Sequence, residues 1–393
     1  MSRFYFDHNA TTPVAPEVIE AVSEALRSGF GNASSIHAEG QNARQLLERA
    51  RRQIAAYTGA SATEIVFTSG GTESDNLAIL GLVRNAPGPH KHVITTTIEH
   101  PAVLESCRQL ENEGAAVTYV PVGPNGTVDP AEIQRHIRPD TVLVSVMHAN
   151  NETGVVQPVA EIAALVCQAR ESGHRIYFHS DGVQALGKVP VNVAKLGVDL
   201  YSMSAHKINA PKGVGALYVR KDVPLRGTQF GGRHERERRA GTENVPGAVA
   251  LGRAIELASA EPIWHKLAHM RDRFEQRILD STHGTEINGA PAFRLPNTSN
   301  LYFPGVDGEA LVIALDLKGF AVSSGAACSS GSVEPSHVLL AMGRPRQEAR
   351  QCVRFSLGRY NTNEQVDALV DAVVASIGQL HASNRKGRLE QHA

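Results

Sequence analysis

Up to about Val219, the chain alternates between short apolar runs with β-character and longer helical segments, and this alternation constrains the fold more than any other feature. The strand-like runs are Glu64–Thr68, His92–Thr97, Val117–Val120, Thr141–Met147, Arg175–Phe178, Val198–Met203 and Ala216–Val219. Such alternation is typical of an α/β fold in which helices cover both faces of a mostly parallel sheet. We therefore expect a sheet of this kind in the first part of the chain.

The length of the chain predicts two domains. A chain of 393 residues exceeds what one hydrophobic core usually supports. A helical region is expected from Val245 to about Asp280, and the shorter elements that follow, with a final helix from Asn363, indicate a smaller α+β domain. The expected boundaries are residues 15–255 for the large domain, and residues 1–14 with 256–393 for the small one.

Composition excludes several classes of function. The formal net charge is −1, so no excess of positive charge favours nucleic acid or an anionic membrane as a partner. No apolar run reaches the roughly 18 residues that a membrane span needs. The amino terminus lacks the charged-then-apolar pattern of a secretory signal, so a cytoplasmic location is expected.

The four cysteines are far apart and form no CxxC pair, which argues against a disulfide framework and a self-contained zinc site. Cys167 lies in an amphipathic helical run and Cys352 precedes an apolar run, so both are expected to be buried. Cys328 differs because nearly all its neighbours between Ser323 and Ser332 are small. An exposed thiol is a chemical hazard unless it is used. We interpret Cys328 as a mobile nucleophile, with an incidental thiol as the alternative.

The stretch from Ile176 to Lys207 places an acid, Asp181, just past one strand-like run and Lys207 beyond the next. Ligand groups gather at the carboxyl ends of strands in α/β sheets. Pyridoxal phosphate requires a lysine for its Schiff base and a carboxylate that keeps its ring nitrogen protonated. The pair therefore indicates this cofactor, and an ordinary surface ion pair is the alternative.

Further candidates lie at other strand ends. Ser69–Ser74 joins a strand to a helix through two glycines and small hydroxyl residues, which suits a phosphate, although a plain turn is the alternative. His100 follows a strand and precedes a proline, where it is either structural or able to stack on a ring and move protons. Arg354 is a candidate for binding a substrate carboxylate, with Arg359 or a structural role as alternatives. The basic loop Gly227–Gly241 is either functional, interfacial or merely solvated.

Several stretches together resemble the group I cysteine desulfurases of the NifS/IscS type, in the class V aminotransferase superfamily. They run in the family order over about positions 4–370: DHNATTP, FTSGGTESDNLAI, TTIEHPAVL, HANNETG, HSDGVQALGK, SAHKINAPKGVGALYVR, RRAGTEN, SSGAACSSGSVEPSHVL and RFSLGRY. The resemblance implies a pyridoxal-phosphate-dependent transferase of fold type I, with a mostly parallel seven-stranded sheet, a smaller α+β domain and a homodimer.

The resemblance also implies roles for the catalytic residues. Lys207 forms the Schiff base with pyridoxal 5′-phosphate, Asp181 pairs with the ring nitrogen, and His100 stacks on the ring and acts as acid or base. Freed Lys207 removes the α-proton of L-cysteine. The Cys328 thiolate then attacks the substrate sulfur and becomes a persulfide while alanine departs.

The other implied contacts follow the family motifs residue by residue. The phosphate is held by Gly71, Thr72, Ser204 and His206, with Thr242 from the other subunit; Asn151 and Gln184 lie near the ring oxygen; and the substrate is bound by Asn9, Asn151 and Arg354.

The expected partner is an iron–sulfur scaffold or another sulfur acceptor protein, and no metal site is expected beyond a transient contact of Cys328 with a cluster. A selenocysteine lyase or another class V pyridoxal-phosphate enzyme is one alternative. A non-catalytic sulfur or cluster carrier that uses Cys328 as a ligand is the other.

Overall fold

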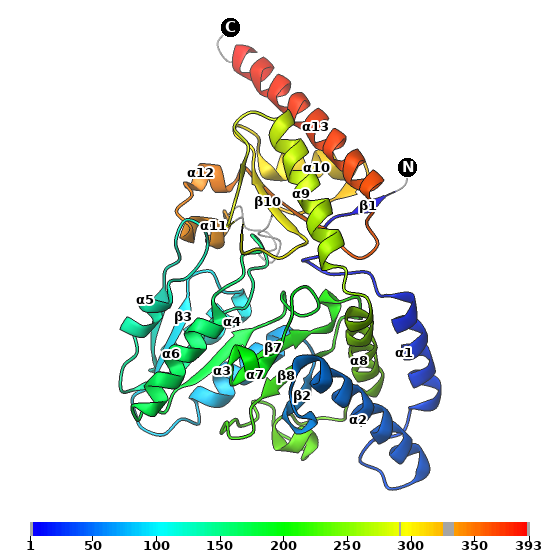
Figure 1. Cartoon of the computed structure of the whole chain (residues 1–393), viewed down its shortest axis with the longest axis vertical. Helices are drawn as coiled ribbons and strands as arrows, with labels where there is room; N and C mark the ends of the chain where they lie inside the picture. The colour runs from blue at the N-terminus through cyan, green and yellow to red at the C-terminus, as the bar shows by residue number, and fades with distance from the viewer. Residues whose placement is uncertain (1–2, 291, 325–333, 391–393) are drawn as a thin grey trace.

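The structure is a computed structural model that describes residues 3–290, 292–324 and 334–390. Its largest element is a seven-stranded sheet (Figure 1). In spatial order the strands are β2 (Ile65–Thr68), β8 (Gly215–Val219), β7 (Leu200–Ser204), β6 (Tyr177–Asp181), β5 (Thr141–Ser145), β3 (His92–Thr96) and β4 (Ala116–Val120). Only β8 runs in the direction opposite to that of the other six strands of this sheet. The expected mostly parallel sheet is confirmed.

Helices cover both faces of this sheet, which explains why the residues of most of its strands are buried without alternation. One face packs against α2 (Ala38–Thr58), α6 (Val159–Glu171) and α8 (Val245–Ala260), and the other against α3 (Gly71–Val83) and α4 (Pro101–Asn112). The remaining elements of this part are α1 (Pro16–Ser28), η1 (Ala62–Glu64), α5 (Pro130–Arg135), α7 (Val193–Leu196), η2 (Ala205–Lys207) and η3 (His234–Glu237). Helix α3 is buried on nearly every side after its first turn, so its sequence is apolar all round.

A smaller α+β unit is built around the antiparallel sheet β9 (Glu286–Ile287), β10 (Thr298–Tyr302) and β12 (Cys352–Ser356). Its helices are α9 (Trp264–Ser281), α10 (Gly308–Leu317), α11 (His337–Ala341), α12 (Arg346–Ala349) and α13 (Asn363–Glu390). Strand β1 (Phe4–Tyr5) pairs in parallel with β11 (Phe320–Ala321), so the start of the chain joins this unit (Figure 1). The predicted residue boundaries of the two domains stay a prediction.

Two details differ from expectation. Cys167 was expected to be buried but is exposed, because the buried face of α6 is formed by Val159, Ile162, Ala163 and Val166. Asp181 is the last residue of β6 and does not lie beyond the strand. Cys352 is buried, as predicted. None of the helices in the described ranges is long and apolar enough to span a membrane.

Candidate active site

A pocket of about 350 Å³ lies at the carboxyl ends of β6 and β7. Among the residues that line it are Asn9, Gly71, Thr72, His100, Asn151, Asp181, Gln184, Ser204, His206, Lys207 and Arg354. The structure therefore brings together sequence-predicted residues from segments as distant as the amino terminus and β12. Cys328 lies outside the described residues. Thr242 is exposed and is not among the lining residues, so its predicted contribution from a second subunit stays a prediction.

Lys207 reaches the pocket from η2, the single turn that follows β7. Its Nζ donates hydrogen bonds to the main-chain oxygens of Asn9, at 2.6 Å, and Ala10, at 2.7 Å. A second contact between the same segments is made by Thr12, whose Oγ1 donates to the carbonyl of His206. The amino-terminal segment thus holds the lysine amine at the edge of the pocket.

Asp181 is buried at the end of β6, where its Oδ1 accepts a hydrogen bond from the Val183 N–H at 2.9 Å. Burial raises the pKa of Asp181, whereas His100, the Val183 N–H and Lys207 act in the opposite direction. Asp75, on α3, is a second buried acid that lines the pocket, and sequence reasoning missed it. Burial and the nearby Asp181 raise the pKa of Asp75 well above its ordinary value. Its signal in the sequence is an acid placed just before the apolar run Leu77–Val83 of the same helix.

His100 is the N-cap of α4, and its Nδ1 accepts the Ala102 N–H at 3.1 Å. Because Nδ1 is the acceptor, a neutral ring carries its proton on Nε2. Burial lowers the pKa of His100, an effect that Asp181 opposes and Lys207 supports. The preceding Glu99 is fully buried, and burial raises its pKa to about 8. A neutral imidazole beside the pocket suits ring stacking and proton movement.

The loop between β2 and α3 has the features of an anion cradle. The N-cap of α3 is Gly70, and no side chain caps the helix there. A Cβ on Gly71 would lie 2.7 Å from Val183 Cγ2, so the backbone approaches its neighbours too closely for a side chain. Ser204 Oγ is buried and lacks a hydrogen-bond partner within the described chain. Helix N–H groups, a glycine and an unused hydroxyl fit a phosphate group.

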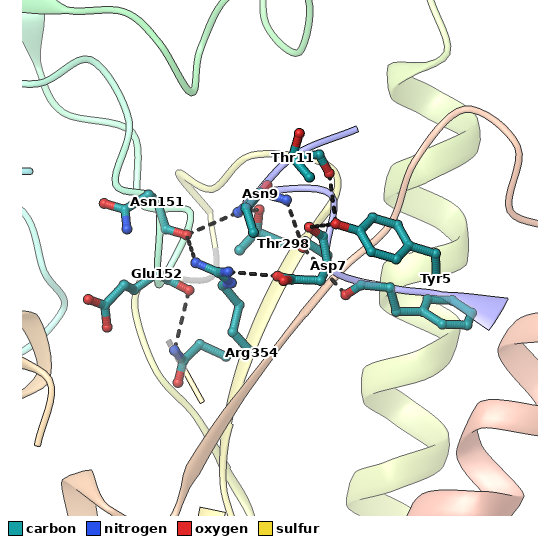
Figure 2. Close-up of polar contacts among 12 residues, drawn as sticks. Tyr5, Asp7, Asn9, Thr11, Asn151, Glu152, Thr298 and Arg354 are labelled. Atoms are coloured by element: carbon teal, nitrogen blue, oxygen red, sulfur yellow. Dashed lines mark hydrogen bonds and ion pairs between the residues drawn. The ribbon is translucent and has the colours of Figure 1, made fainter. Parts of the chain in front are cut away.

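Arg354, on β12, points toward the pocket and joins three segments of the chain (Figure 2). Its Nη1 donates to the Asn151 carbonyl at 2.9 Å and its Nη2 to Asp7 Oδ1 at 2.7 Å. Its buried Nε has no partner among the residues that the structure describes. Arg359 instead pairs with Glu261 and does not line this pocket. Of the two arginines, Arg354 is the one placed to meet a substrate.

The described residues before Cys328 contact a residue that lines the pocket, and those after it contact residues adjacent in sequence to lining residues. Before it, Ser323 exchanges main-chain hydrogen bonds with Arg354 at 3.2 and 2.7 Å. After it, Ser336 Oγ bonds to Glu152 at 2.5 Å, and His337 Nε2 lies 3.0 Å from the carbonyl of Glu99.

Comparison with known proteins agrees with this geometry. Residues 4–369 match the model of the aminotransferase class-V family. The cysteine desulfurase of Trichormus azollae is 47% identical over 97% of this chain and 94% of its own length. Cysteine desulfurase IscS of Dictyoglomus turgidum is 46% identical over 96% and 95%. A solved NifS-like protein superimposes with a TM-score of 0.90 at 38% identity, over 96% of this chain and all of that one.

The fold and the site define a class V aminotransferase, and the chain belongs to that family, whose members use pyridoxal phosphate. Within the family it is a cysteine desulfurase of the IscS/NifS type. A further solved structure, SspA in complex with cysteine, superimposes with a TM-score of 0.80 at 35% identity, over 91% of this chain and 99% of that one. These relatives favour the desulfurase over the two alternatives that the sequence left open.

Proposed function

We propose that this protein removes sulfur from L-cysteine with pyridoxal phosphate held in the 350 Å³ pocket, and that Cys328 carries the sulfur to an acceptor protein. The observation that supports this most is the meeting of three features in one pocket: the Lys207 amine, the buried Asp181 carboxylate and the glycine cradle before α3. Each matches a different part of the cofactor: aldehyde, ring nitrogen and phosphate.

Different residues of the pocket would hold different parts of the cofactor. Lys207 would bind it covalently and Asp181 would face its ring nitrogen, with His100 stacked on the ring. The phosphate would be held by Gly71, Thr72, Ser204 and His206, with Thr242 from a second copy of the chain, and the ring oxygen would face Asn151 and Gln184. When bound, the cofactor supplies an electron sink for charge that develops at the substrate α-carbon.

Arg354 is the proposed partner of the substrate carboxylate, assisted by Asn9 and Asn151. The buried Nε of Arg354 is an unused donor in the described chain, which supports this role. An arginine held on a rigid strand also orients a carboxylate well, since its planar fork fixes two hydrogen bonds.

The chemical steps that follow use the chain's own groups. Lys207 Nζ takes the α-proton of L-cysteine, and its contacts with the Asn9 and Ala10 carbonyls favour the protonated amine that results. The Cys328 thiolate attacks the substrate sulfur, so a sulfur–sulfur bond forms as the substrate Cβ–S bond breaks. The electron pair of the broken bond stays with the carbon fragment, which is protonated and leaves as alanine.

The persulfide then passes to an iron–sulfur scaffold or another sulfur acceptor, in the cytoplasm, and the working unit is a homodimer. The described residues on both sides of the Cys328 segment lie at or next to the pocket lining, which supports a thiol that reaches the substrate.

The decisive experiment compares wild type with Cys328→Ser for release of sulfide and alanine from L-cysteine under reducing conditions. We expect the variant to lose at least about 100-fold in turnover, because the nucleophile that accepts sulfur is gone. Cys167→Ser is the matched control, since Cys167 is an exposed thiol remote from the pocket lining. Unimpaired turnover by Cys328→Ser would exclude the persulfide route.

A further inference from the structure

A buried lysine lies directly behind the pocket. Lys188 is only 7% exposed, in the turn that follows β6, and it is not among the residues that line the 350 Å³ pocket. Its Nζ donates to Gln184 Oε1 at 2.6 Å and to Asn9 Oδ1 at 3.0 Å. Both acceptors are neutral amides, and no carboxylate of the described chain forms an ion pair with this amine.

A buried lysine without a counter-ion is costly and therefore needs a reason. Burial lowers the pKa of Lys188 well below its ordinary value, and the charges of Lys207 and Arg354 act in the same direction. A neutral amine carries two N–H groups, which equals the number of acceptors that Lys188 has here. Burial therefore favours the neutral amine, and both neutral acceptors of Lys188 are supplied by the fold.

The two bonds of Lys188 close a ring with a third. Gln184 Nε2 donates to the main-chain oxygen of Asn9 at 2.9 Å, while Lys188 binds both Gln184 Oε1 and Asn9 Oδ1. The same Asn9 oxygen accepts Lys207 Nζ at 2.6 Å. The ring therefore ends on the carbonyl that holds the lysine amine.

We propose that Lys188 is a positioning residue that fixes the Asn9 carbonyl and the Gln184 amide, and through Asn9 the amine of Lys207. With its Oε1 bound to Lys188, Gln184 keeps its NH₂ group toward the Asn9 carbonyl and the pocket. Lys188 acts through these neighbours and is not a catalytic residue. The inference rests on the proposed role of Lys207.

The test is Lys188→Met, which keeps an unbranched apolar stem of similar length and removes both donors. The first measurement is the affinity of the cofactor-free chain for pyridoxal phosphate, followed by visible absorbance. The second is exchange of the α-proton of L-alanine in D₂O by the holoenzyme, followed by NMR. This exchange needs the Lys207 amine but no sulfur transfer.

We expect the maximal exchange rate to fall by at least about tenfold, with KM for L-alanine within about threefold of wild type, because a misplaced base slows proton transfer more than it weakens binding. Cofactor affinity should fall by at least about threefold, since Gln184 loses the bond that orients it. Wild-type values for both measurements in folded Lys188→Met would overturn the proposal.

Two further variants complete the test: one is a control, and the other replaces Lys188→Met if that variant does not fold. Lys318→Met is the matched control, because Lys318 Nζ also donates to two neutral acceptors, Ser376 Oγ at 2.9 Å and Gln379 Oε1 at 3.2 Å, far from the pocket lining. It should leave both measurements unchanged, and equal losses in this control would overturn the specific role of Lys188. Where Lys188→Met does not fold, Lys188→Gln decides, because its neutral amide ends one bond short of the lysine amine and cannot keep both bonds, to Gln184 Oε1 and Asn9 Oδ1. A slower exchange in Lys188→Gln supports the proposal, and an unchanged exchange contradicts it.

Failure of the proposed function gives a different pattern. A wild-type protein that exchanges the α-proton of L-alanine but releases no sulfide from L-cysteine would refute the desulfurase steps, while the comparison of Lys188→Met with Lys318→Met would still decide the role of Lys188.

Discussion

The two walls of the pocket satisfy their polar groups in opposite ways. The sheet wall consists of Asp75, Asp181 and Ser204. The N-terminal wall consists of the lining residues Asn9 and Arg354, together with Thr298 and Asp7, which hydrogen-bond to them from outside the lining. In the sheet wall, Ser204 Oγ is buried without a hydrogen-bond partner among the described residues, and Asp75 Oδ1 has only the long contact with His179 Nε2, at 3.5 Å. In the N-terminal wall, hydrogen bonds join the side chains across distant segments (Figure 2). Of its four side chains, only that of Arg354 has a buried atom, Nε, without a partner among the described residues.

This difference shows which wall the chain completes by itself. An unpaired buried polar group costs free energy, so the sheet wall gains most from a ligand. The N-terminal wall is already a hydrogen-bonded network, and it fixes Lys207 and Arg354 before any ligand binds. Ligand binding should therefore stabilise the sheet wall, whereas substitutions in the N-terminal wall should damage the fold itself.

The largest effect is expected at Lys207, where the two walls meet. Lys207→Ala should lower alanine formation from L-cysteine by at least about 10⁴-fold, because one amine both attaches the cofactor and accepts the α-proton. The thermal unfolding midpoint measured by circular dichroism should stay within a few degrees of that of the cofactor-free wild type. Turnover above about one-hundredth of wild type would show that another base does this work.

A pH-dependent effect is expected at Glu99, which is buried beside the sheet wall. Burial raises its pKa from 4.5 to about 8, so the folded chain keeps a proton that the unfolded chain loses. Folding therefore becomes less favourable as pH rises from about 4.5 to 8, and the full loss is present above pH 8. Glu99→Gln removes this cost and should raise the free energy of unfolding by about 2–4 kcal/mol at pH 8, with no gain near pH 4.

Urea unfolding of the cofactor-free Glu99→Gln variant and wild type at both pH values measures this difference. A stability difference that stays constant between pH 4 and pH 8 would contradict the assignment of a protonated Glu99.

Thr298→Val probes the N-terminal wall. The Thr298 hydroxyl accepts from Asn9 Nδ2 at 2.9 Å and donates to Asn297 Oδ1 at 3.1 Å, so its loss leaves two buried amides short of partners. We expect the free energy of unfolding to fall by about 1–3 kcal/mol in urea titrations. Thr95→Val is the matched control, since the buried Thr95 hydroxyl has no partner within the described ranges, and this variant should be neutral or slightly stabilised. Equal losses of unfolding free energy in Thr298→Val and Thr95→Val would contradict the view that the paired hydroxyl stabilises the fold and the unpaired one does not.

The smallest effect is expected for Ser204→Ala in the sheet wall, and it should have opposite signs without and with the cofactor. Removing an unpaired buried hydroxyl should stabilise the cofactor-free chain by about 0.5–1 kcal/mol, measured in urea. The same change should weaken binding of pyridoxal phosphate by about tenfold, measured by absorbance titration, because a phosphate contact is lost. A cofactor-free chain destabilised by more than about 1 kcal/mol would mean that the hydroxyl has a partner.

The parts of the fold that were predictable are those with a local signal. The mostly parallel sheet follows from strand and helix alternation, and Lys207 and Asp181 follow from their places at strand ends. The strand order, in which β8 lies between β2 and β7, depends on pairing between distant segments and has no local signal. Cys167 shows a related limit, because an amphipathic run indicates a buried face without settling the residues at its border.

The residues missed at the site were missed for two physical reasons. Asp75 and Lys188 matter because burial changes the properties of their charged groups, and burial is a property of the packed molecule. Asp7 acts through Arg354, which is 347 positions away in the chain. In the sequence, the only sign of the first two is a charged residue beside an apolar run, which follows Asp75 and surrounds Lys188.

The most direct test of the central claim is to reduce the holoenzyme with borohydride, digest it and locate the pyridoxyl group by peptide mass spectrometry. The group should be found on Lys207, in the peptide that also contains His206. Modification of a different lysine, such as Lys188, or a protein that takes up no pyridoxal phosphate at all, would contradict the account of this pocket.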